Sequence, residues 1–368
     1  NAMGVTIPGT TVCGVPLAAA IGAFGGDPQK GLKTLEDITP RHVEMAQKLI
    51  ANNAVDIAVE ETPDFIHLDL TLSAGENCCR VVVKGTHTNV VELYINGQPQ
   101  PLSEKQNTSI QRETLPTFSL QQAYDFINRV DLNDIRFILD AARLNSALAA
   151  EGKTKKYGLN INGTFSDAVK NGLMSNDLLS KVIINTVAAS DARMGGAPVV
   201  AMSNFGSGNQ GITATMPVVV VAEHLGVDEE TLARALSLSH LTAISIHSRY
   251  TRLSALCAAS TAAMGAAAGM AWLFTRDINT INTAIINMVS DITGMICDGA
   301  SNSCAMKVSS VVSSAFKAVL MAMQNSCAGA NDGIVCADVE QTINNLCRLV
   351  IKPMTLTDKE IISIMVAK

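Results

Sequence analysis

Charged and aromatic residues are scarce in this chain of 368 residues. Only 16% of its residues are charged, against about 25% in an average globular protein, and 4% are aromatic. The net charge of −6 disfavours nucleic acid as a partner, because phosphate binding needs clustered Lys and Arg. The scarcity of aromatic side chains also disfavours a platform on which bases stack. With 48% hydrophobic residues, the chain is too apolar for a disordered protein.

Several catalytic motifs are missing as well. The sequence contains no GxSxG, no HExxH and no P-loop. The segment Gly206-Ser-Gly-Asn-Gln-Gly211 spells GxGxxG, but no clear strand precedes it and no acidic residue follows on a second strand. A dinucleotide site needs both features, so we disfavour one here.

One long segment without charge has to be tested as a membrane span. Residues 254–275 contain no charged side chain, and Gly265 and Gly269 form a small-xxx-small pattern. Alanine, which is only weakly hydrophobic, dominates this segment, so we expect a buried helix that packs closely against its neighbours. No membrane is expected as a partner.

The cysteines indicate the compartment. There are nine, an odd number in a chain too long to need disulfide cross-links. The first residues have neither the basic segment nor the cleavage pattern of a secretory signal. We therefore expect a cytoplasmic protein whose thiols are free for metal binding or catalysis.

The pattern of apolar residues predicts an α+β protein in two parts. Residues 4–112 have the features of a small α/β domain, with a mixed sheet and a helix in a βαβ-type or helix-on-sheet unit, and residues 113–368 those of a large helical domain. The polar stretch at 99–116 is the expected linker. Strands are expected at 55–59, 65–72, 79–84 and 90–95, and a helix at 40–51, where Thr39-Pro40 forms a typical start. In the second part, helices are expected at 120–128, 132–151, 176–190, 217–224, 228–246, 253–275, 278–295, 305–323 and 336–350.

Two segments rich in Gly, Ser and Asn interrupt the helical part, at 203–215 and 297–304. Such residues permit a close approach of the backbone and local hydrogen bonds. In the first segment, a loop before a helix is suited to bind a carboxylate through backbone N–H groups. The side chains that would bind the substrate are those of Asn204, Ser207, Asn209 and Gln210, with Asp191 and Arg193 from the preceding helix. A tight interhelical loop and a local salt bridge are the alternatives.

Cys297 and Cys304 flank the second segment, and Cys257 stands forty residues earlier. A helical hairpin would bring the three thiols to one centre, yet their spacing matches no standard cluster motif. Buried structural cysteines are therefore the alternative.

Four further side chains are candidates for a catalytic role. His240 and His247 stand seven residues apart on an expected helix, where a structural role is the simpler interpretation. His87 lies at a strand end among polar neighbours, so we place it ahead of them as a catalytic base. Lys307 follows Cys304 by three residues and is the second catalytic candidate, as a cation for a carboxylate; a solvated charge is its alternative.

Five segments closely resemble the bacterial serine dehydratase α-chain-like family that includes L-cysteine desulfidase and is related to the iron–sulfur L-serine dehydratases. They are residues 4–10, 188–196, 203–217, 253–259 and 294–307. The resemblance covers nearly the whole chain, and long uninterrupted matches make it specific for the family.

The resemblance implies a cofactor and an activity. Cys257, Cys297 and Cys304 match the positions that hold an oxygen-labile [4Fe–4S] cluster in this family, which uses no pyridoxal phosphate. Three ligands leave one iron open as a Lewis acid for the substrate. The expected enzyme is a carbon–sulfur or carbon–oxygen lyase of amino-acid catabolism. It converts L-cysteine to pyruvate, ammonia and sulfide, or acts as an L-serine dehydratase.

The sequence also departs from the family. Relatives carry a further segment before residues 4–10, with a cysteine in a Gly-Cys-Thr-Glu-Pro context, so we expect an incomplete first domain and an activity that depends on that segment. A non-catalytic amino-acid-binding or regulatory protein is therefore the alternative, and a zinc protein is a third hypothesis. The low charge favours an interface between copies, so a homodimer is also expected.

Overall fold

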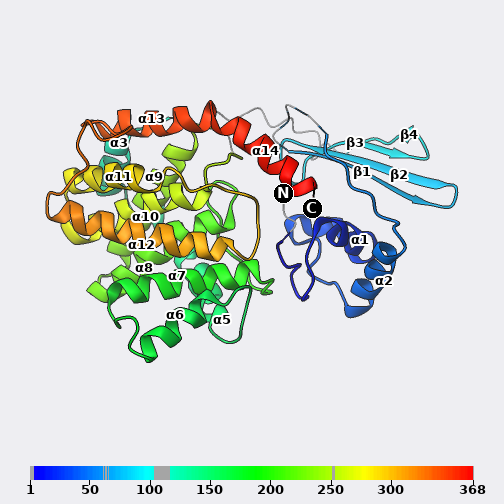
Figure 1. The fold of residues 1–368 in the computed structure, drawn as a ribbon, viewed down its shortest axis with the longest axis horizontal. Coiled ribbons are helices and arrows are strands. Elements are labelled where there is room, and N and C mark those ends of the chain that lie inside the picture. Colours follow the sequence, from blue (N-terminus) through cyan, green and yellow to red (C-terminus); the bar gives the residue numbers. More distant parts are fainter. Residues whose placement is uncertain are drawn as a thin grey trace. The chain divides into compact units, whose positions relative to one another are not determined.

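The computed structural model describes residues 4–60, 62, 64, 66–102, 117–250 and 253–367. The chain divides into two compact units, one of Val12–Leu115 and one of Asn1–Thr11 with Pro116–Lys368. A small antiparallel sheet near the N-terminus and a long helical region make the protein α+β. Figure 1 shows the elements of each unit.

The smaller unit contains two helices and a four-stranded sheet. The helices are α1 (Val15–Gly25) and α2 (Pro40–Ala51), separated by the 3₁₀ helix η1 (Pro28–Lys33), and the strands are β1 (His67–Ala74), β2 (Asn77–Lys84), β3 (Val90–Ile95) and β4 (Gln98–Pro99). Each strand pairs antiparallel with the next, in the order β1-β2-β3-β4. Antiparallel neighbours need only tight turns between them. The expected βαβ-type arrangement and mixed sheet are therefore wrong.

In the smaller unit, the expected helix is confirmed, but one of the expected strands is wrong. The helix at 40–51 is confirmed residue for residue, with Thr39 as a capping box that accepts from His42 N. Asn96 and Gly97 have the positive φ angles of a tight hairpin turn. The strand expected at 55–59 is wrong, because this segment has no regular structure. Ile57 and Val59 are more than half exposed. Alternating apolar and polar residues favour a strand, but a strand also needs a neighbouring strand to pair with, and this segment has none among the described residues.

The larger unit is helical. Its helices are α3 (Leu120–Arg129), α4 (Leu132–Ile135), η2 (Arg136–Ile138), α5 (Leu139–Gly152), α6 (Ile161–Lys170), α7 (Leu178–Met194), α8 (Gly208–Leu225), α9 (Glu229–His247), α10 (Ala258–Thr275), α11 (Ile278–Ile292), α12 (Cys304–Met323), α13 (Val339–Ile351) and α14 (Met354–Val366). Periodicity did not predict α1, α6 or α14.

Helix α10 is the centre of this unit, packed among α8, α9, α11 and α12 (Figure 1). Its residues from Ala259 to Leu273 are buried, which confirms the expected buried helix. A Cβ at Gly265 would collide with the Ser239 carbonyl oxygen, and one at Gly269 would lie 2.9 Å from the Ala235 carbonyl oxygen. The two glycines therefore allow α9 to approach the backbone of α10.

Helix α12 alone, among the residues that the structure describes, is long and apolar enough to cross a membrane. Half of its apolar window is buried, and it packs against α7, α10 and α11. These contacts are those of a core helix.

Helix α8 begins nine residues earlier than expected. Its first residue is Gly208, and Pro217 lies inside the helix rather than at its start. Ser207 caps the helix by accepting from Gln210 N. Residues 208–215, predicted as part of a loop, are therefore the first turns of a buried helix.

Candidate functional site

The three candidate cysteines come from separate segments that the backbone joins. Cys257 immediately precedes α10, Cys304 opens α12, and Cys297 lies in the connection before α12. Leu256 and Ile296 form an antiparallel bridge, in which Cys257 N donates to Met295 O (2.9 Å) and Cys297 N donates to Ala255 O (2.7 Å). This pairing sets Cys257 and Cys297 on adjacent strands of backbone.

The thiols influence one another electrostatically. Burial raises the pKa of Cys257 to about 12, and the charges of Cys297 and Cys304 add to this shift. Burial likewise raises the pKa of Cys297, with a further contribution from Cys304. Cys257 stands at the N-terminus of α10, which favours negative charge, but burial still raises its pKa. Within the described residues, no three His, Cys, Asp or Glu side chains are placed to share one metal ion.

Lys307 is fixed beside this segment as a cation. Its Nζ donates to Ile296 O (2.8 Å) and forms an ion pair with Asp298. Burial lowers the pKa of Lys307, but the hydrogen bond and charge of Asp298 outweigh burial, so the net pKa shift is upward. Lys307 is therefore an ammonium group in the first turn of α12.

Arg193, in the last turn of α7, contacts the start of α8. A Cβ at Gly208 would collide with Nε of Arg193, so glycine leaves room for the guanidinium. Burial lowers the pKa of Arg193, and the charge of Cys304 opposes that shift. Among the described residues, no carboxylate forms an ion pair with Arg193; its hydrogen bond goes to Met194 Sδ (2.9 Å). The arrangement therefore offers a desolvated positive charge near Cys304 and the N-terminus of α8.

A tight turn leads into α8. Asn204 and Ser207 exchange backbone hydrogen bonds of 3.1 and 2.9 Å, and the two residues between them, Phe205 and Gly206, have φ angles of 48° and 81°. Positive φ at both central positions defines a type I′ turn, in which Asn and Gly are favoured. A phenylalanine there is strained, because its Cβ approaches the following carbonyl oxygen.

Behind the turn lies a buried chain of hydrogen bonds. Asn204 Nδ2 donates to His240 Nδ1 (3.0 Å), so the His240 proton is on Nε2, which donates to Thr215 Oγ1 (3.0 Å). Asn204 Oδ1 accepts from Gln210 Nε2 (2.9 Å), and Gln210 Oε1 accepts from His247 Nδ1 (2.8 Å). Burial lowers the pKa of His240 to about 4. His240 is therefore neutral at physiological pH.

The His247 ring is enclosed by two aromatic rings. Phe205 stacks on it with a centroid distance of 4.3 Å, and Tyr250 with 4.5 Å. Tyr250 Oη is 2.6 Å from Thr261 Oγ1 in α10, and its pKa, raised mainly by burial, also feels the charge of Cys257. The stack thus extends from the α8 turn towards the cysteine segment.

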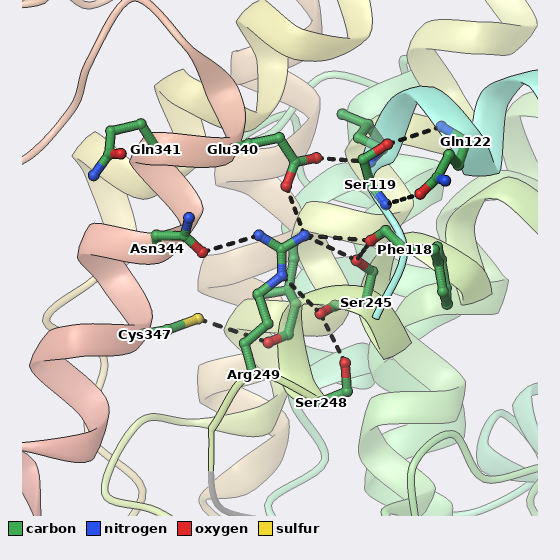
Figure 2. Close-up of polar contacts among 12 residues, drawn as sticks. Phe118, Ser119, Gln122, Ser245, Ser248, Arg249, Glu340, Gln341, Asn344 and Cys347 are labelled. Atoms are coloured by element: carbon green, nitrogen blue, oxygen red, sulfur yellow. Dashed lines mark hydrogen bonds and ion pairs between the residues drawn. The ribbon is translucent and has the colours of Figure 1, made fainter. Parts of the chain in front are cut away.

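Polar contacts of Arg249, just after α9, hold the C-terminal end of that helix (Figure 2), and His247 is the last residue of α9. Arg249 forms an ion pair with Glu340 Oε2 (2.7 Å) and donates to Asn344 Oδ1 (3.1 Å), both in α13. It also donates to Phe118 O (3.4 Å), just before α3. These groups line an open pocket on α13. Arg249 therefore ties the end of α9 to α13 and to Phe118 before α3.

Asp191 has a different environment from the one expected of a substrate ligand. Its Oδ2 accepts from Asn162 N (2.8 Å) and Asn162 Nδ2 (3.0 Å) at the start of α6. Burial raises the pKa of Asp191, and the bonds from Asn162 oppose that shift. Asn209 also has internal partners, since its Oδ1 accepts from Ser190 Oγ (3.3 Å) and its Nδ2 donates to Met194 Sδ (3.3 Å).

The N-terminal segment 4–10 contacts the same region. Thr6 N donates to Met194 O (3.2 Å), Gly9 N donates to Gly196 O (3.1 Å), and Gly4 forms a bridge with Ser301. The segment therefore lies across the end of α7 and the connection that carries the cysteines. His87 belongs to the other unit, where it is exposed between β2 and β3, and its catalytic role stays a prediction.

Sequence reasoning missed Phe205, Tyr250 and Arg249. The Phe-Gly pair inside a Gly- and Asn-rich segment is the one local signal that indicates a turn. Arg249 contacts Glu340 and Asn344 in α13, far along the chain, so no spacing reveals its role. Tyr250 contacts His247 and Thr261, which are near it in the sequence but belong to two different helices.

Comparison with known proteins gives consistent results. A family model described as serine dehydratase alpha chain matches residues 29–363. A UPF0597 protein from Klebsiella pneumoniae subsp. pneumoniae is 98% identical over 368 residues, which are 100% of this chain and 87% of that protein. UPF0597 protein YhaM of Salmonella typhimurium is 50% identical over 374 residues, covering 100% of this chain and 86% of that protein. The family match includes every residue of the site except segment 4–10.

Proposed function

Because this chain belongs to the serine dehydratase alpha chain family, we propose that it is an iron–sulfur lyase that acts on L-cysteine or L-serine. Its products are pyruvate and ammonia, with sulfide from L-cysteine or water from L-serine. The observation that carries this proposal is the backbone pairing that sets Cys257 beside Cys297, just before Cys304 opens α12. Arg193, which forms no ion pair with a carboxylate among the described residues, supplies a positive charge near Cys304.

The donor set fits a [4Fe–4S] cluster. The candidate donors are all thiols: Cys257 and Cys297 lie on paired segments of backbone, and Cys304 opens α12. Cysteine thiolates are the usual ligands of such clusters. Ligands of a cluster bind different iron atoms and are separated by its body, whereas ligands of a single ion converge on one point. Cys257, Cys297 and Cys304 would hold the cluster, whose open iron would supply Lewis-acid stabilisation of the leaving group.

The residues of the chain bind and orient the substrate. Its carboxylate would lie at the N-terminus of α8, where backbone N–H groups and the helix dipole favour an anion, and Arg193 would neutralise its charge. Lys307, held as an ammonium group by Asp298, keeps positive charge near the departing group.

The reaction needs a base for the α-proton. When that proton leaves, its electron pair forms the Cα–Cβ double bond and the Cβ–S or Cβ–O bond breaks. The resulting aminoacrylate takes up a proton at Cβ, and water then replaces the nitrogen to give pyruvate and ammonia. The catalytic role of His87, which belongs to the other unit, stays a prediction.

Metal content tests this function directly. We expect protein purified anaerobically and supplied with iron and sulfide to become brown and to retain both elements. A colourless protein without iron, from the full-length chain, would overturn the proposal. The same carboxylate site also supports a non-catalytic amino-acid-binding protein. That second function predicts calorimetric binding of L-cysteine or L-serine by cluster-loaded protein without formation of pyruvate.

A further inference from the structure

The turn before α8 keeps a strained conformation that a different residue would relieve. Phe205 has a φ of 48° at a position where Asn or Gly is favoured. Strain of this kind persists when surrounding contacts enforce it, and it gathers at ligand-binding sites. The contacts that enforce it here are therefore informative about the site.

Those contacts come from one residue of α9. The His247 ring stacks on Phe205 at 4.3 Å with an angle of 24° between the rings. His247 Nδ1 also donates to Gln210 Oε1 (2.8 Å), and Gln210 Nε2 donates to Asn204 Oδ1 (2.9 Å). His247 thus holds the tip of the turn by stacking, and through Gln210 it holds the turn's first residue.

The position of His247 is fixed from its other side. Tyr250 stacks on the opposite face of its ring, and Arg249 ties the end of α9 to Glu340 and Asn344 in α13 (Figure 2). His247 is only 2% exposed. A rigid support on α9 therefore sets the conformation of the turn that begins α8.

We propose that His247 and Phe205 are positioning residues for the carboxylate-binding N-terminus of α8. They fix Asn204, Ser207 and Gln210 so that the first N–H groups of α8 face the same point as Arg193, which contacts Gly208. This inference rests on the proposed function. If these residues position the binding site, they make the protein selective for substrates that carry an α-carboxylate. Their loss should then weaken substrate binding and leave the rate of the chemical step nearly unchanged.

Two variants separate the stack from the hydrogen bond. Phe205→Asn suits a positive φ but removes the ring, and His247→Phe retains an aromatic ring but removes the bond to Gln210. Phe205→Tyr keeps the ring and serves as the conservative variant. The matched controls are Phe137→Asn and His224→Phe, because Phe137 and His224 are exposed.

The experiment measures kinetics and binding in cluster-loaded protein. For the first two variants we expect KM for L-cysteine or L-serine to rise about tenfold with kcat within about twofold, the pattern of lost uniform binding. Calorimetry with L-alanine, which has no leaving group, should show a similar loss of affinity. L-Alaninamide, which lacks the carboxylate, should bind all forms alike, and Phe205→Tyr and the controls should match the wild type.

Two results would overturn the inference. One is an unchanged KM and unchanged L-alanine affinity in both variants. The other is an equal loss of affinity for L-alanine and L-alaninamide, which would indicate general disruption. Failure of the proposed function is a separate result: wild-type protein that loads a cluster but neither binds nor converts these amino acids. In that case the inference falls with it.

Discussion

The guanidinium of Arg193 lies directly against the Cα of Gly208: a Cβ at residue 208 would collide with Nε and fall 2.9 Å from Cζ. Gly208→Ala should therefore displace Arg193 from the N-terminus of α8. We expect KM for the amino-acid substrate to rise about tenfold, which equals about 1.4 kcal/mol of lost binding. Steady-state assays of pyruvate formation measure this. An unchanged KM would show that the guanidinium does not bind the carboxylate.

The cysteine assignment makes a separate prediction. Replacing Cys257, Cys297 or Cys304 by Ser, one at a time, should reduce bound iron and the visible absorption of reconstituted protein to background. Cys327→Ser is the matched control, because Cys327 is exposed and has no proposed ligand role. Iron and sulfide analysis decides the matter, and full retention of iron in any one of the three variants would remove that residue from the cluster.

Close packing at the centre of the helical unit predicts a loss of stability. A Cβ at Gly265 would collide with the backbone of α9 at Ser239, so Gly265→Ala should cost about 1–3 kcal/mol, as overpacked cores do. Gly22→Ala in α1 is the control, since a Cβ there meets no atom within 4 Å. Urea denaturation compares the two variants, and equal free energies of unfolding would contradict the packing argument.

The lowered pKa of His240 predicts how the free energy of unfolding depends on pH. Its pKa falls from the ordinary 6.5 to about 4 because of burial, so the unfolded chain binds a proton more readily than the folded one. Stability should therefore decrease as pH drops from 6.5 towards 4, by about 3 kcal/mol in total from this group. His240→Gln should lose that part of the dependence. Urea denaturation at pH 7 and pH 5 compares the variant with the wild type, and identical pH slopes would contradict it.

Local sequence signals predicted much of the fold. The capping pair Thr39-Pro40 gave the bounds of α2, and the alanine-rich pattern of 254–275 gave a buried helix. Pro217 misled the prediction of α8, because proline is typical of a helix start, whereas here it lies inside a buried helix that Ser207 caps. Pro40 lies at the start of its helix and Pro217 lies inside one, and the spacing of apolar residues does not distinguish these two positions.

The candidate site was less accessible from the sequence. The resemblance, rather than spacing, selected Cys257, Cys297 and Cys304, since the bridge between Leu256 and Ile296 that joins their segments spans forty residues. The link from His247 to Gln210 likewise joins α9 to α8. Such contacts depend on how helices pack, and a single sequence contains no record of that packing.

The proposed lyase activity is measured as pyruvate formation from L-cysteine and L-serine, by the same protein with and without its reconstituted cluster. We expect iron-loaded protein to form pyruvate and ammonia in equal amounts from at least one of them, with sulfide when L-cysteine is the substrate, and iron-free protein to form none. Iron-loaded full-length protein that forms no pyruvate from either amino acid would contradict it, as would an equal rate after removal of the iron.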